Sequence, residues 1–416
     1  MHQQILLNKK HWKTGLYSLF AFIFVISLIN YPETALNSSL RSINIWWNVV
    51  FPSLFPFFIV SELLIGFGVV HFMSVLLEPL MRPVFNLPGS GAFVMTMGFA
   101  SGYPMSAKLT AKLREQELVN QYEGERLVCF TTTSDPLFMF GAIAVGFFHD
   151  PTIGIMLVVI HYLAALLLGV GMRYYERNRP ISKPLTQSGK GMILVRALQA
   201  MHRARLKDNR PLGKLLGDAV MSAFHTLALI GGFMMLMAVI LALLQATNVS
   251  AWIISCINWL LPLFGISTEL SPALMTGIFE VTLGSQEASL AANALISEKI
   301  FIVAMILAWS GLSVHAQIAA ILSTTDIRYK PFFFSRIIHA ILCGALTLLL
   351  WKPLTAFLQF QASPAYSNHT PNSPWQINLT EYIGAMFAIH FGLWIIILLV
   401  GIATHIFKKF FQDKLF

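Results

Sequence analysis

Two stretches decide the fold: SGAFVMTMGFASGYPMSAKLTAKLREQE at residues 90–117 and SPALMTGIFEVTLGSQEASLAANALIS at residues 271–297. Each begins with an apolar half, continues with a half of small and polar residues, and carries glycines near its middle. Neither half is long enough to cross a bilayer, because a spanning helix needs about 20 apolar residues. Irregular backbone is tolerated at membrane depth only where protein buries it or where it lines a wet cavity. Each stretch therefore predicts a re-entrant hairpin of two half-helices that meet inside the membrane.

The composition around these stretches is that of a membrane protein. The 416 residues are 56% hydrophobic and 11% charged, whereas a soluble domain carries about 25% charged residues. Backbone groups in lipid must be paired internally, so the long apolar runs predict helices, and the alternating pattern of a barrel is absent from the sequence. Spanning helices are expected at residues 15–31, 45–68, 127–148, 152–172, 217–245, 299–325, 332–360 and 381–407, an even number that places both termini on one side of the membrane.

Charge sets the expected orientation. The segment 173–214 holds eleven Lys and Arg residues against Glu176 and Asp208. Loops this basic stay in the cytoplasm, so the segment and both termini are predicted to be cytoplasmic and the polar stretch 361–380 to be external. Binding of nucleic acid or anionic lipid would also suit a basic loop, but topology explains the charge without such a partner, and we expect no nucleic acid.

The two hairpins align with each other at a constant offset of 179 residues, which places Gly98 on Gly277 and Ser106 on Ser285. The apolar helix before each hairpin and the polar-interrupted helix after it also match in order. The expected orientation makes the two halves run in opposite directions. Secondary transporters use such inverted repeats, with broken helices meeting at a midplane binding site. We therefore predict an all-α polytopic membrane protein with an inverted repeat, two re-entrant hairpins and broken helices.

Polar side chains in the hairpins and broken helices are the candidate binding site, because polar groups in lipid are costly and usually face a cavity or a partner. Half-helix N-termini suit a carboxylate or a phosphate, and Lys108 would strengthen that preference. Glu280, Glu287 and Asp135 could instead hold a cation or carry a proton. The candidate substrate-binding residues are Ser101, Gly102, Tyr103, Ser106, Lys108, Thr133, Ser134, Asp135, Glu280, Ser285, Gln286, Glu287, Ser310, Ser313 and His315.

Structural alternatives remain open for several of these residues. Lys108 could pair with Glu287 or Asp135 and so lock the hairpins rather than bind a solute. Asp135 followed by Pro136 is also the pattern that starts a helix, since Asp caps helices and Pro suits their first turn. Glu62, a carboxylate in the middle of an apolar helix, requires a partner of its own.

Other kinds of chemistry find little support in the sequence. The three cysteines, Cys129, Cys256 and Cys343, lie in apolar segments without metal-like spacing, so we read them as small hydrophobic residues and expect no metal. The motifs of zinc proteases, serine hydrolases and P-loop ATPases are absent from the sequence. We therefore expect neither an enzyme nor a bound cofactor, with H⁺ or Na⁺ as the candidate coupling ions.

Three motifs carry a resemblance to a known family: FPSLFPF at 51–57, GFASGYP at 98–104 and TSDP at 133–136. They resemble the sporulation integral membrane proteins of the YlbJ/SpoVV family, within the nucleoside-recognition (gate) group that is similar to concentrative nucleoside transporters. The resemblance covers roughly residues 40–350. It implies a multi-pass protein of the bacterial cell membrane, in the mother-cell-derived outer forespore membrane, that moves dipicolinate, free or with calcium, toward the spore.

The resemblance and the repeat together suggest the domain organisation and the functional alternatives. The expected parts are an N-terminal tail with the first helix at 1–44, a first gate-like repeat at 45–172, a basic cytoplasmic loop at 173–216, a second, inverted repeat at 217–360, and an outer loop with the last helix at 361–416. The alternatives to a dipicolinate carrier are a carrier of nucleosides or other small solutes, and a non-transporting scaffold or sensor. A homo-oligomer or other sporulation membrane proteins are candidate partners.

Overall fold

The computed structural model describes residues 2–136, 138–179, 181–182 and 192–361. The ordered elements of this part are all helical, which confirms the all-α fold class. Among the described residues, four helices are long and apolar enough to cross a membrane, or up to six if each bent helix pair counts as one span. The predicted last crossing at 381–407 and the predicted outer loop from residue 362 onward lie outside the described residues.

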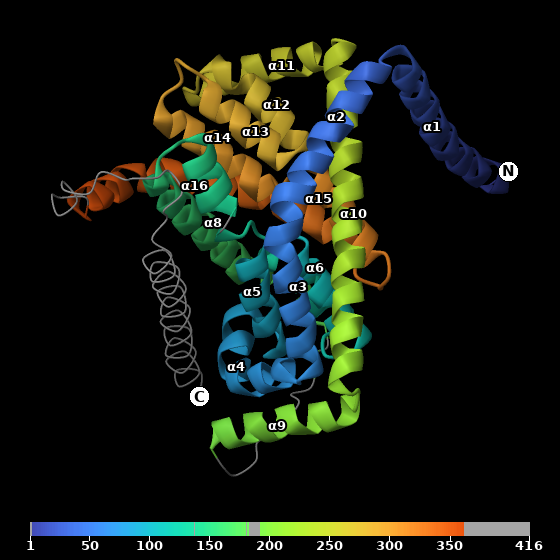
Figure 1. Cartoon of the computed structure of the whole chain (residues 1–416), viewed down its shortest axis with the longest axis vertical. Helices are drawn as coiled ribbons and strands as arrows, with labels where there is room; N and C mark the ends of the chain where they lie inside the picture. Colours follow the sequence, from blue (N-terminus) through green and yellow to red (C-terminus); the bar gives the residue numbers. More distant parts are fainter. Residues whose placement is uncertain (1, 137, 180, 183–191, 362–416) are drawn as a thin grey trace.

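The second crossing begins earlier than the sequence predicted. Helix α2 (Pro32–Ile45) continues through a π-helical turn (Trp46–Val50) into α3 (Phe51–Gly66), so the start predicted at residue 45 is wrong. Polar residues such as Asn37 and Arg41 give α2 the composition of a loop. Helix α1 (His2–Asn30) meets α2 at a bend of 98° and projects away from the other helices (Figure 1).

The first half contains the predicted hairpin and the predicted break. After α3 come α4 (Val69–Phe85), α5 (Ser90–Ser101), α6 (Met105–Glu115), α7 (Gln121–Thr131), a π-helical segment (Phe138–Phe147) and α8 (Pro151–Met172). Helices α5 and α6 are the two short arms expected for residues 90–117. The backbone leaves the helical conformation after Thr131, inside the run predicted to cross at 127–148.

The basic segment between the halves contains a helix that the sequence pattern did not reveal. Helix α9 (Ile193–Asp208) packs against α4, and Ala197 and Ala200 are buried against Val75. Its other face exposes both apolar and basic side chains, so its hydrophobic stripe is too narrow to stand out from its charges. Figure 1 places α9 at one end of the molecule, beneath α4.

The second half repeats the order of the first. It consists of α10 (Leu212–Ala246), α11 (Val249–Leu260) with a 3₁₀ turn (Leu261–Phe264), a second 3₁₀ turn (Thr268–Leu270), α12 (Ser271–Phe279), α13 (Val281–Leu290), α14 (Ile296–Trp309), α15 (Gly311–Leu322) and α16 (Tyr329–Gln361). The predicted second hairpin is α12 with α13, and the second predicted break falls at Ser310.

Backbone geometry supports the inverted repeat beyond the order of the helices. Helices α4 and α11, which precede the two hairpins, are both flanked by residues in the left-handed conformation. These are Gly68 and Asn86 for α4, and Asn248 and Gly265 for α11 with its 3₁₀ turn. Helices α4 and α11 lie at opposite ends of the molecule (Figure 1), as two halves of opposite direction require. The offset of 179 residues also carries the end of α7 onto the break at Ser310.

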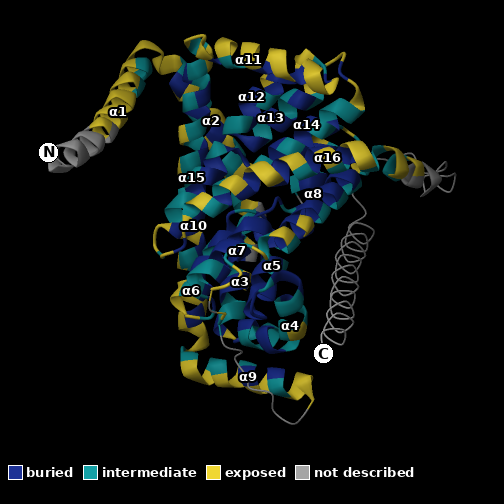
Figure 2. Cartoon of the chain, turned by 180° about the vertical axis from the view of Figure 1, so that it is seen from behind, coloured by how far each residue is buried: buried dark blue, intermediate teal, exposed yellow. Residues whose placement is uncertain are grey.

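Burial separates the central helices from the peripheral ones. In the most apolar stretch of α8, and in that of α14 with α15, 72% of the residues are buried. The corresponding shares for α10 and α16 are 44% and 39%. The buried residues form a continuous core between the two halves (Figure 2). Helices α10 and α16 therefore present more side chains to lipid, and the hairpins and broken helices lie inside.

The orientation can be tested with single cysteines. His202 on α9 and Ala292 after α13 are both exposed. In a background in which the exposed Cys256 is replaced by serine, we expect an impermeant maleimide added outside cells to label Ala292→Cys. We expect His202→Cys to react only after the membrane is permeabilised, because basic segments stay in the cytoplasm. The opposite labelling pattern would reverse the direction of both hairpins.

Candidate substrate site

The turn of the first hairpin packs on the first helix break. Gly102 ends α5 with φ 71° and ψ −173°, a region that only glycine adopts readily. A Cβ atom added at Gly102 would lie 2.7 Å from Oδ2 of Asp135. Asp135 lies in the break after α7, and its Oδ1 accepts a hydrogen bond of 2.8 Å from the Phe138 amide. Asp135 therefore caps the segment that follows the break, as the Asp-Pro pattern at the start of a helix predicted.

Helix α8 holds the hairpin and the break together. The Tyr162 hydroxyl is 2.8 Å from the Phe99 carbonyl oxygen on the hairpin and 3.0 Å from that of Ser134 in the break. The Ser134 amide donates to Nε2 of His161 over 3.1 Å. Ser106 of α6 adds a hydroxyl contact of 2.9 Å with Thr132. Predicted site residues of the first half thus meet at one junction.

The second hairpin makes an equivalent junction. Glu280 is the extended residue between α12 and α13, and its carboxylate caps α13 by accepting a 2.7 Å hydrogen bond from the Leu283 amide. The Trp309 indole donates to the Ile278 carbonyl over 3.0 Å. A Cβ atom on Gly311 would lie 3.1 Å from the Phe279 carbonyl oxygen. In both halves the joint of the hairpin therefore lies against the break of the next helix.

A pocket of about 110 Å³ opens between α2, α10 and α13. Arg41 donates to Oε1 of Gln286 over 2.9 Å and interacts electrostatically with Glu280 and Glu287. Oε2 of Glu287 is buried without a hydrogen-bond partner among the described residues. One guanidinium and two carboxylates thus share the pocket, which can bind a carboxylate at one side and a proton or cation at the other. Its lining also includes Ser38, Ser42, Gln245 and Thr282.

Lys108 does not face this pocket. Its Nζ lies 3.3 Å from Oε1 of Glu62 on α3, and Lys112 pairs with the same carboxylate. The Ser222 hydroxyl donates to Oε1 of Glu62 over 2.9 Å. The predicted locks to Glu287 or Asp135 are therefore wrong, because α6 turns this face toward α3 and α10. The partners that Glu62 required are these two lysines and Ser222.

This three-charge cluster is expected to contribute strongly to stability. Replacing Glu62 with glutamine would leave two lysines without their counter-ion, and removing one partner of a buried pair costs about 3 kcal/mol. Glu62→Gln should therefore lower the thermal unfolding midpoint of the purified protein. The control is Asp218→Asn, which breaks a more exposed pair with Arg210 and should change stability by about 1 kcal/mol or less. Equal shifts for both variants would contradict the prediction.

The remaining predicted residues lie in separate places. His315 is buried beside the second break, with Nδ1 2.6 Å from the Tyr329 hydroxyl and Nε2 3.0 Å from the Trp309 carbonyl oxygen. Ser310 and Ser313 are buried near it. Among the predicted residues, Glu280, Gln286 and Glu287 line the pocket. The residues at the first junction are Ser101, Gly102, Tyr103, Ser106, Thr133, Ser134 and Asp135.

Ion pairs join the two halves away from the pocket. Arg114 at the end of α6 binds both carboxylate oxygens of Asp326, over 2.8 and 2.9 Å. These hydrogen bonds hold the pKa of Asp326 below its ordinary value. Arg328 binds the buried carboxylate of Glu125 on α7 over 2.7 and 2.9 Å. The loop between α15 and α16 is thus tied to the first half.

Two arginines were missed by sequence reasoning. Arg41 lies before residue 45, where the second crossing was expected to begin, and so outside the segments considered for the site. Arg336 is fully buried on α16, inside the predicted crossing at 332–360. A lone cation in an apolar run marks a functional or structural site in membrane proteins, so this signal was present in the sequence.

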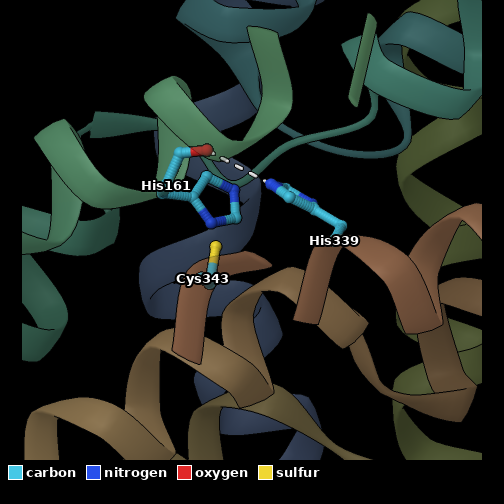
Figure 3. A group of neighbouring side chains, drawn as sticks. All are labelled: His161, His339 and Cys343. Atoms are coloured by element: carbon cyan, nitrogen blue, oxygen red, sulfur yellow. Dashed lines mark hydrogen bonds between the residues drawn. The ribbon is translucent and has the colours of Figure 1, made fainter. Parts of the chain in front are cut away.

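A buried group of His161, His339 and Cys343 has the composition of a metal site, with potential ligand atoms within 4.8 Å of one another (Figure 3). The hydrogen bonds do not fit a metal. Nε2 of His161 accepts the Ser134 amide, so the proton of the neutral ring is on Nδ1. Nδ1 of His339 accepts from Arg336, so Nε2 donates to the His161 carbonyl over 3.2 Å. Both ring lone pairs that a metal would need are already in use.

Comparison with known proteins places the chain in a family. It is 45% identical over 348 residues to "Sporulation integral membrane protein YlbJ" of Bacillus subtilis (strain 168), which covers 84% of this chain and 85% of that protein. The chain belongs to the YlbJ family of sporulation integral membrane proteins. The family model for nucleoside recognition (Gate) matches residues 47–166. In this chain the match spans the first hairpin and the first break, while the pocket residues of α2 and α13 lie outside it.

Proposed function

We propose that this protein is a secondary-type transporter of a small anionic solute, and that the solute is dipicolinate moved toward the forespore. The observation that carries the proposal is the pocket in which Arg41 faces Glu280, Gln286 and Glu287 beside a half-helix joint. Such joints are where transporters with inverted repeats bind their substrates. The name of the relative supports a role in sporulation, and we further propose the outer forespore membrane as the location.

The charges of the pocket suit a carboxylate that travels with a cation. An arginine fork binds a planar carboxylate through two parallel hydrogen bonds, which Arg41 can offer. Glu280 and Glu287 would repel a dianion unless they carry protons or share a cation with it. We therefore expect uptake coupled to H⁺, Na⁺ or a calcium ion that accompanies the solute. No residue of the lining is aromatic, so the pocket would recognise an aromatic solute through its polar groups rather than by ring stacking.

Uptake by the purified protein in vesicles tests the proposal. We expect labelled dipicolinate to accumulate above the level of protein-free vesicles, and imposed pH, sodium and calcium gradients identify the coupling ion. Unlabelled dipicolinate should compete strongly, pyridine-2-carboxylate more weakly because it has one carboxylate, and uridine hardly at all. Competition by uridine with no dipicolinate uptake would replace the proposal with nucleoside transport.

A non-transporting scaffold would rely on a surface rather than on the pocket. Helix α9 exposes Arg203 and Lys207 together with Leu198 and Leu206, and such a face could recruit a partner. A double Arg203→Gln/Lys207→Gln variant separates the two functions without disturbing the packing of α9 on α4. A carrier should keep its uptake in vesicles and support sporulation, whereas a scaffold should fail in sporulation.

A further inference from the structure

Arg336 is a buried cation whose charge has no counter-ion in the described part of the chain. Its guanidinium donates to the carbonyl oxygens of Thr132, over 2.5 Å, and of Cys129. It also donates to Nδ1 of His339 over 3.2 Å. All three acceptors are neutral. No carboxylate of the described residues is among the groups that interact electrostatically with it.

Capping of α7 explains part of this arrangement. Cys129 and Thr132 offer carbonyl groups at the end of α7, where the helix dipole supplies about half a negative charge. A guanidinium within a protein in a bilayer requires more compensation, because a buried ion without a partner is strongly destabilising. An anion that binds during the working cycle would supply it.

Several buried donors of Arg336 and of the first junction also lack a well-formed hydrogen bond among the described residues. They are Nε of Arg336 itself and the hydroxyls of Thr133, Tyr103 and Ser134. The last two hydroxyls interact with each other, but not through a well-formed hydrogen bond. Buried polar atoms are nearly always paired in folded proteins, and each exception requires an explanation such as an unrecorded ion. Here the exceptions gather at the first junction, where the Tyr103 hydroxyl interacts electrostatically with Arg336. Each of these groups can donate a hydrogen bond to an anion.

The junction also lies within electrostatic range of the pocket. Glu280 interacts electrostatically with Arg41 in the pocket and with Tyr103 in the first hairpin. Glu280 of the second half is thus within electrostatic range both of Arg41 in the pocket and of Tyr103 in the first hairpin. The Asp135 carboxylate also interacts with Tyr103, and its Oδ1 is held by the Phe138 amide.

We propose that Arg336, together with the hydroxyls of Tyr103, Thr133 and Ser134, forms a second, buried anion site that binds a carboxylate group of the solute after it leaves the Arg41 pocket. This proposal rests on the proposed function only in that the solute is an organic anion. The pocket sets the affinity for the arriving solute, and the second site lowers the barrier for its passage between the halves.

The Tyr103→Phe variant tests the site without disturbing the fold. The Tyr103 hydroxyl interacts with the Ser134 hydroxyl but makes no well-formed hydrogen bond among the described residues, so its removal should lower the thermal unfolding midpoint little. In vesicles, the maximal rate of dipicolinate uptake should fall about tenfold, the usual effect of losing one hydrogen bond to a charged group. The KM, set at the Arg41 pocket, should change less than about twofold. Arg336→Lys keeps the charge but loses the fork, and should reduce the rate at least as much.

The control is Tyr329→Phe, which removes a hydroxyl that is hydrogen-bonded to His315. This variant should lower the thermal unfolding midpoint, and should not lower the maximal uptake rate selectively while leaving the KM unchanged. Wild-type uptake by both Tyr103→Phe and Arg336→Lys would overturn the second site and leave the proposed function standing. A wild-type protein that neither binds nor takes up dipicolinate would instead overturn the proposed function.

Discussion

Dipicolinate uptake by the Arg41→Ala variant is expected to require at least about thirtyfold more solute for half-maximal rate. The guanidinium is the cation that lines the pocket, and its partner there is the amide oxygen of Gln286. In the occupied pocket the guanidinium would pair with a carboxylate of the solute. Losing one partner of such a desolvated charged pair costs about 2 kcal/mol or more, and each 1.4 kcal/mol is a factor of ten in affinity. Alanine would also leave Glu280 and Glu287 facing the solute without a compensating positive charge.

Two further variants make this result specific. Arg41→Lys keeps the charge but offers no planar fork, so an intermediate loss of about tenfold is expected. Arg203→Gln removes an exposed arginine from α9 and should leave the KM unchanged. Initial uptake rates over a range of dipicolinate concentrations, at equal protein content, give all three values. An Arg41→Ala protein with the KM of the wild type would remove the pocket from the pathway.

Local chemistry is what made the hairpins and breaks predictable. Gly102 and Pro104 at one joint, and the polar runs at Thr131 and Ser310, disrupt helices wherever they occur, and so their positions could be located without knowing the fold. The constant offset of 179 residues then related the two halves. These features depend on neighbours in the chain, for which a single sequence is informative.

Contacts between distant segments could not be predicted in this way. Arg41 and Gln286 are 245 residues apart and meet only because α2 packs beside α13. The polar face of α2 resembles a loop in sequence, since its polar residues line a pocket rather than face lipid. Lys108 was predicted to line the substrate site because it is a charged residue in a hairpin. Its actual partner, Glu62, depends on how α6 is rotated against α3, which hydropathy does not determine.

The largest conformational effect is expected at Gly102. Substitution by valine should abolish dipicolinate uptake while the protein still inserts into the membrane. The backbone at Gly102 has φ 71° and ψ −173°, which costs other residues about 1–3 kcal/mol. The added Cβ would also lie 2.7 Å from Oδ2 and 3.1 Å from the amide nitrogen of Asp135. Relief of both strains requires the hairpin to move away from the break, which separates the groups of the first junction.

The choice of control decides whether this result reports on the junction. Gly68, the residue before α4, is an unsuitable control, because it has φ 82° and a Cβ atom there would lie 2.6 Å from the Met201 carbonyl oxygen. Gly232 on α10 has open space around its Cβ position and a helical backbone, so Gly232→Val should retain uptake. Membrane abundance and uptake of both variants should be measured in the same vesicles. Near-normal uptake by Gly102→Val at normal abundance would show that the joint can move without loss of transport, and the first hairpin would no longer belong to the solute pathway.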